Sequence, residues 1–139
     1  MKKLLTILLA ALLCVCCVSM VACKEEAGVE GTYKMYSVTI SGTTYEVGDT
    51  IPAGAFMGNP VDMVLAAEYM SLELNKDGTA VSKMNGEVMN NEMTWSKSGN
   101  TITITYNGGG SDEATLNGNE LSMVTNSPAG EMTYVLKKA

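Results

Sequence analysis

The chain has 139 residues, a formal net charge of −6 at pH 7, no histidine, and nine basic side chains, all of them lysine. An acidic protein without arginine repels phosphate backbones, so the composition excludes nucleic acid as a partner. The absence of histidine removes the commonest general base and the commonest ligand of transition metals. We therefore expect no metal and no other cofactor.

The first 22 residues have the pattern of an export signal. Two lysines open the chain, and an uncharged run rich in Leu, Ala, Val and Cys extends over residues 4–22. A basic start, an apolar run and a small residue at the cleavage point are typical of signal peptides. Cys23 directly follows Ala22, and Met20-Val21-Ala22-Cys23 resembles the lipobox of bacterial lipoproteins. The resemblance implies that Cys23 is diacylated and becomes the mature N-terminus.

Two alternatives remain for this segment. The 19 uncharged residues of 4–22 approach the ~20 that a helix needs to cross a bilayer, so an uncleaved membrane anchor is one. Simple secretion is the other. Lipidation is favoured because Cys23 alone among the four cysteines follows a small residue. It would attach the protein to the outer face of the bacterial cytoplasmic membrane, or to the outer membrane of a diderm host, with residues 23–30 as a tether.

Removal of residues 1–22 leaves seven lysines against fifteen carboxylates, a net charge of −8. Three of the four cysteines leave with the signal, so the remaining domain cannot form an intramolecular disulfide. Residues 31–139 are enough for one domain with a modest core, which packing alone must stabilise.

Short alternating segments predict that residues 31–139 form an all-β domain. Glycine and asparagine separate segments of mostly 5–10 residues in which polar and apolar side chains alternate, most clearly over 101–106. This pattern is typical of antiparallel sheets with one buried face. We predict eight or nine strands, at about 32–40, 43–47, 70–75, 79–84, 87–96 (with a break at 90–91 left open), 101–106, 112–116, 120–126 and 131–136.

One stretch departs from the strand pattern. Asn59-Pro60-Val61-Asp62 offers an N-cap, a proline at the first helical position and a carboxylate near the helix start. Apolar residues follow at roughly helical spacing. The sequence therefore predicts a short helix over 60–68, preceded by a long surface loop over 48–59.

These elements predict an antiparallel up-and-down β-barrel or half-open barrel with one short helix. A β-sandwich is the alternative, because both architectures produce the same alternation. In either fold we expect a shared set of apolar side chains in the core: Leu72, Trp95, Ile102, Ile104 and Leu121.

No residue set in the sequence supports catalysis. Asp112 and Glu113 are neighbours in a predicted strand, so their carboxylates point to opposite faces and cannot flank one bond. Ser96 and Lys97 precede an apparent turn that would not shield a nucleophile. Residues 75–79 resemble part of a calcium-binding loop, but the glutamate that should complete such a loop as a bidentate ligand is missing. An enzyme whose catalytic groups are carboxylates alone remains an alternative, but no arrangement of residues in the sequence supports it.

The nine methionines after the signal are more suggestive, because they accompany a single Phe and a single Trp. Methionine fills irregular cores and also lines adaptable binding surfaces. Core packing is one interpretation and a methionine-lined ligand cavity is the other, whereas copper handling is disfavoured by the lack of histidine. The candidate cavity residues are Tyr33, Met93, Trp95 and Met123.

The order of strands and turns resembles the lipocalin-like (calycin-type) domains of small bacterial lipoproteins. Gly31-Thr32-Tyr33 is similar to the G-x-W opening of that superfamily, with Tyr in place of Trp. The rhythm continues to about residue 137 through four further segments: Leu72-x-Leu74-Asn75-x-Asp77-Gly78-Thr79, Trp95-x-x-x-Gly99-Asn100-x-Ile102-x-Ile104, Leu116-x-Gly118-Asn119-x-Leu121 and Tyr134-Val135-Leu136-Lys137. The resemblance implies a barrel.

The sequence as a whole predicts a membrane-tethered, non-catalytic binding domain of the cell envelope. The expected ligand is a small apolar or amphipathic molecule. The alternative is a structural or protein-interaction module, whose partner is an envelope protein and whose barrel is filled by its own side chains. An eight-stranded barrel of this size has room for either arrangement.

Overall fold

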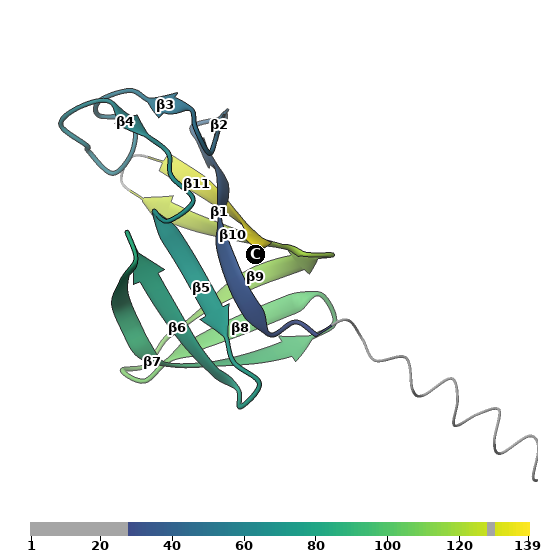
Figure 1. Cartoon of the computed structure of the whole chain (residues 1–139). Helices are drawn as coiled ribbons and strands as arrows, with labels where there is room; N and C mark the ends of the chain where they lie inside the picture. Colours follow the sequence, from purple (N-terminus) through teal and green to yellow (C-terminus); the bar gives the residue numbers. More distant parts are fainter. Residues whose placement is uncertain (1–27, 128–129) are drawn as a thin grey trace, which may run out of the picture.

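The computed structural model describes residues 28–127 and 130–139. Eight antiparallel strands close into a barrel (Figure 1): β1 (Gly31–Ile40), β5 (Met70–Leu74), β6 (Thr79–Met84), β7 (Glu87–Ser98), β8 (Thr101–Tyr106), β9 (Ser111–Asn117), β10 (Glu120–Ser127) and β11 (Gly130–Lys138). Each strand pairs with the next in this order, and β11 pairs with β1. The predicted barrel is therefore confirmed in its closed form, and the structure is neither a half-open barrel nor a sandwich.

All nine predicted strand ranges fall on observed strands. Eight of these strands form the ring. The remaining one, predicted at 43–47, is β2 (Thr43–Glu46), which pairs with the second half of β1 but lies outside the ring. β7 is continuous, and its register against β6 shifts twice rather than breaking the strand. The β6–β7 turn is Asn85-Gly86, and both residues have positive φ (51° and 82°), as a two-residue type I′ turn requires.

The strand β1 is shared between three partners. Its first half pairs with β5, its second half pairs with β2, and β11 pairs along its other edge. The register against β11 shifts between Met35 and Ser37, and a bulge of this kind bends a strand and increases its twist. β1 thus continues past the wall of the barrel and carries the following residues over one end (Figure 1).

The barrel has two unlike ends. The proximal end holds the start of β1 and the turns at 75–78, 99–100 and 118–119. The distal end holds the turns at 85–86 and 107–110. The segment between β2 and β5 lies over this distal end in Figure 1, where β3 (Thr50–Ile51) and β4 (Met63–Val64) are labelled. We call residues 47–69 the cap segment.

The buried face of the strands follows the predicted alternation. Leu72, Ile102, Ile104 and Leu121 are buried, which confirms four of the five expected core residues. Trp95 is only partly buried, because its indole N–H reaches the proximal turn and donates to the Asn75 carbonyl oxygen at 2.9 Å. A buried tryptophan needs such a partner for its N–H, and here the partner lies at the rim of the barrel.

The predicted helix over 60–68 is wrong, since the described residues contain no helix. Asn59, the expected helix cap, instead accepts from the Phe56 N–H at 3.0 Å and donates to the Val61 carbonyl oxygen at 2.7 Å. The Asp62 carboxylate accepts from the Ala53 N–H at 2.8 Å. These short polar side chains hydrogen-bond to the backbone of a loop, which is the conformation that competes with a helix.

The cap segment is packed rather than being a plain surface loop as predicted. Ile51, Phe56 and Leu65 are each at most 2% exposed. The Phe56 ring meets Tyr69 edge-on at 5.1 Å between centroids, and Tyr134 of β11 at 6.3 Å. The cap segment therefore adds its own apolar side chains to the distal end of the core.

Residues 1–22, Cys23 and the tether as far as residue 27 lie outside the described residues. Within 28–127 and 130–139, no helix has the length and apolar character needed to cross a membrane.

Candidate functional site

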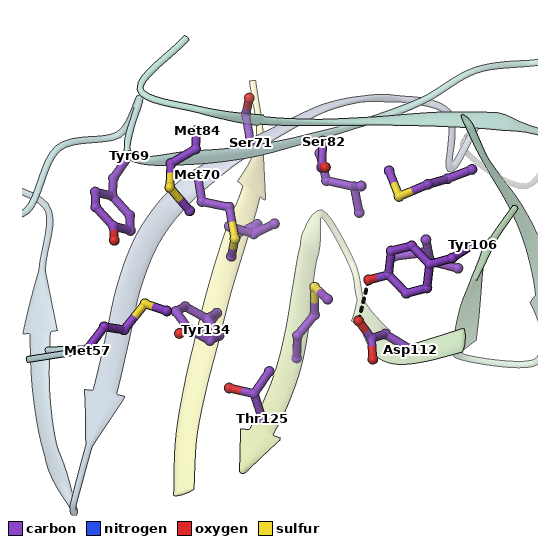
Figure 2. A pocket seen from close by; sticks show the side chains of 15 residues that line it. Met57, Tyr69, Met70, Ser71, Ser82, Met84, Tyr106, Asp112, Thr125 and Tyr134 are labelled. Atoms are coloured by element: carbon purple, nitrogen blue, oxygen red, sulfur yellow. Dashed lines mark hydrogen bonds between the residues drawn. The ribbon is translucent and has the colours of Figure 1, made fainter. Parts of the chain in front are cut away.

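A cavity of about 260 Å³ occupies the distal half of the barrel (Figure 2). Strands on every side of the ring except β1 contribute to its wall, and the cap segment adds two residues. Fifteen side chains line it: Met57, Tyr69, Met70, Ser71, Leu72, Ser82, Met84, Met93, Ile104, Tyr106, Asp112, Met123, Thr125, Tyr134 and Leu136.

Methionines form a third of this wall. They are Met57, Met70, Met84, Met93 and Met123. Unbranched thioether side chains adapt to ligands of different shape and tolerate an irregular cavity better than branched aliphatics do. Met57 is 65% exposed, which places it where the cavity meets solvent. The wall is thus deformable and open near the cap segment.

The structure brings together two of the four predicted cavity residues. Met93 and Met123 line the cavity, whereas Tyr33 and Trp95 do not. The Tyr33 side chain is 1% exposed and its hydroxyl donates to the Val29 carbonyl oxygen at 2.6 Å, at the proximal end. Strand alternation indicates that a side chain faces inward, but it does not indicate the height at which that side chain lies.

The sequence analysis missed two cavity residues for which the sequence contained a signal. Met70 and Met84 face each other across the β5–β6 hairpin. Pairing outward from the Asn75–Gly78 turn would have placed these two methionines side by side at the distal end. Met57, Tyr69 and Tyr134 had no such signal, because the cap segment brings the first two to the site from outside the alternating strands.

Tyr106 and Asp112 form the polar side of the cavity. The Tyr106 hydroxyl donates to Asp112 Oδ2, as the dashed line in Figure 2 shows. Burial, this hydrogen bond and the negative charge of Asp112, in that order, raise the pKa of the Tyr106 phenol to about 12. Tyr106 therefore stays a neutral donor to the carboxylate at any physiological pH.

Further polar groups are poorly matched to one another. The Thr125 hydroxyl oxygen is buried and has no hydrogen-bond partner among the described residues. It lies near the Tyr134 phenol, but that hydroxyl contacts the Met132 sulfur at 3.8 Å, a weak acceptor. Burial raises the pKa values of Tyr69 and Tyr134, so both phenols are neutral. An unpaired buried hydroxyl is a group that a ligand could satisfy.

The acidic side chains of β9 follow the alternation of the strand. Ile104 pairs with Asp112 and Thr103 pairs with Glu113, so the two carboxylates lie on opposite faces of the sheet, as expected. Among the described residues, no three His, Cys, Asp or Glu side chains gather as metal ligands.

A family model described as a lipocalin-like domain matches residues 29–123. The chain belongs to the lipocalin-like family. The matched range begins just before β1, ends within β10, and contains twelve of the fifteen residues that line the cavity. Comparison with curated proteins and with solved structures found no match. The resemblance seen in the turn and core residues is thus confirmed, and lipocalin-like domains are generally non-catalytic binding proteins.

Proposed function

We propose that this lipocalin-like protein is an exported, lipid-anchored binding protein of the bacterial cell envelope that holds a small apolar or amphipathic molecule in its barrel. The observation that carries the proposal is the distal cavity, which combines five methionines and three aliphatic side chains with a few polar groups. Ligand sites are concave, mainly apolar, and oriented by a small number of polar contacts.

The size of the cavity limits the ligand. Sites for drug-sized molecules measure roughly 300–1,000 Å³, and this cavity of about 260 Å³ falls just below them. A molecule with one ring or a short chain matches that volume, whereas a complete diacyl lipid does not.

The placement of the cavity is compatible with a membrane anchor. Residue 28, the first described, leads into β1 at the proximal end (Figure 1). The cavity lies at the distal end. Diacylation of Cys23 would attach the domain through its proximal end. The distal opening would then remain accessible to ligands outside the membrane.

Lipidation can be tested with Cys23→Ala. We expect the wild-type protein to partition into the detergent phase and to carry an acylated Cys23 as its N-terminus, because two acyl chains together anchor a protein stably. The variant should remain unprocessed and lose the acyl mass. Identical acylation and membrane retention in both proteins would contradict the assignment.

Ligand binding can be tested with methionines carrying a ¹³C-labelled methyl group. Five of the nine methionines in the described residues line the cavity, and Met35, Met63, Met89 and Met132 serve as internal controls. A short apolar probe such as 1-octanol should shift the signals of the five and leave the four unchanged. If apolar probes of this size shift none of the five, the barrel is filled in solution and the interaction module is the better interpretation.

A further inference from the structure

The wall of the cavity carries charge of only one sign, which is negative. Asp112 is the only charged side chain among the fifteen lining residues, and no lysine is among them. Within the described part of the chain, three lysines pair with carboxylates outside the cavity wall: Lys34 with Glu68, Lys83 with Glu73 and Lys137 with Glu120. Among the described residues, the cavity wall therefore contains no cation that would neutralise Asp112.

The Tyr106 hydroxyl orients the Asp112 carboxylate, which remains accessible to a ligand. Its Oδ2 accepts from the Tyr106 hydroxyl, and the side chain remains exposed. Asp112 is exposed and pairs with the inward-facing Ile104, so the carboxylate lies where the cavity meets solvent. A hydrogen bond in which one group is charged is roughly twice as strong as one between neutral groups.

We propose that the cavity selects small amphiphiles with a protonated amine, whose ammonium group binds Asp112 while the apolar body lies among the methionines. This inference rests on the proposed binding function and assigns the chemical class of the ligand. An anionic amphiphile of the same length would bring its carboxylate against Asp112 and would find no cation in the wall. The net charge of −6 of the whole chain favours the approach of cations as well.

Three probes that share an eight-carbon chain isolate the contribution of charge: octylamine, 1-octanol and octanoate. At pH 7, binding of any of the three probes should shift the methyl signals of the five cavity methionines. Octylamine should bind about tenfold or more tightly than 1-octanol, because its ammonium group forms an ion pair with Asp112 that the neutral hydroxyl of 1-octanol cannot form. Octanoate should bind more weakly than 1-octanol.

Asp112→Asn tests the residue itself. Asparagine keeps the size of the side chain and an oxygen that can accept from Tyr106. The variant should lose about tenfold or more of its affinity for octylamine, and its affinity for 1-octanol should change less than about twofold. Glu113→Gln is the matched control, because it removes the same charge from the outer face of the same strand and should change neither affinity.

The outcomes separate this inference from the proposed function. If 1-octanol binds and octylamine binds no better, or if Asp112→Asn binds octylamine as the wild type does, the selectivity is wrong and the binding function stands. If no probe shifts the five methionines, the binding function itself fails. Should Asp112→Asn not fold, added salt should weaken octylamine binding to the wild type and spare 1-octanol; salt-independent octylamine binding would overturn the inference.

Discussion

The two ends of the barrel share the same eight strands and differ in how their polar groups are satisfied. At the proximal end, the Tyr33 hydroxyl is bonded to Val29, the Trp95 indole to Asn75, and the Ala139 N–H to the Thr32 carbonyl oxygen. At the distal end, the buried Thr125 hydroxyl lacks a partner among the described residues, and the Asp112 side chain is exposed.

The packing of apolar side chains also differs between the proximal and the distal end. Leu121 and Ile102 are completely buried near the proximal end, whereas the distal wall encloses an open volume and a third of its residues are methionines. A fully satisfied, close-packed region stabilises the fold, and an incompletely satisfied one can bind. Close packing and the open cavity are thus separated along the axis of this barrel.

The sharpest test of this separation compares two side chains of β10. Leu121→Ala should lower the free energy of unfolding by about 2–5 kcal/mol, because it opens a void in packed core. Met123→Ala, two residues along on the same inward face, should cost about 1 kcal/mol because Met123 already borders the cavity. Urea denaturation measures both. Equal losses would show that the two ends are equally packed.

A second test addresses the cap segment. Phe56→Leu removes the edge-on ring contacts with Tyr69 and Tyr134, each worth about 0.5–1.5 kcal/mol beyond burial. We expect local opening to become easier by about 1–2 kcal/mol. Amide hydrogen exchange should accelerate at Gly48 and Leu65, which bond across the base of the segment, and should stay unchanged in β8. Acceleration throughout the barrel would instead indicate that cap and barrel unfold as one unit.

A third test compares two buried tyrosines. Tyr33→Phe leaves the Val29 carbonyl oxygen without its donor and should destabilise the protein by about 1 kcal/mol. Tyr134→Phe removes a weak contact to the Met132 sulfur and a contact with the Thr125 hydroxyl that falls short of a hydrogen bond, so its stability should stay within about 0.5 kcal/mol of the wild type. Thermal or urea unfolding of both variants decides the point. A larger loss in Tyr134→Phe would place the tighter polar packing at the distal end.

A fourth test concerns alkaline pH. The Tyr106 pKa is raised from 10.0 to about 12 in the folded state, so folding favours the protonated phenol. Its contribution to stability is complete below pH 10 and is lost as the pH rises toward 12. Between these values, the urea midpoint of Tyr106→Phe should fall less steeply with pH than that of the wild type. Parallel slopes would contradict a buried, hydrogen-bonded Tyr106.

The strands were predictable because alternation with period two reports which residues share a face. In residues 101–106 this pattern alone places Ile102 and Ile104 in the core. The cap segment was not predictable from the same signals. Asn59 and Asp62 have the side chains of a helix start, and only the tertiary structure shows that they bond to a loop instead.

The candidate site was predictable in part for a related reason. Met93 and Met123 face inward by alternation and line the cavity, yet Tyr33 faces inward too and lies at the other end. Asp112 resembled an ordinary solvated residue at a strand start. Its importance emerges only when the ring closes and brings Tyr106 and the methionines around it.

The pairing of β1 with β11 removes the edges that an open sheet of the same strands would expose. The last described strand pairs with the first, over a register from Tyr33–Lys138 to Ile40–Met132. An unpaired strand edge offers its backbone groups to the strands of other chains. Without β11, β1 and β10 would each present such an edge. Closure of the ring by β11 therefore protects the protein against edge-to-edge aggregation.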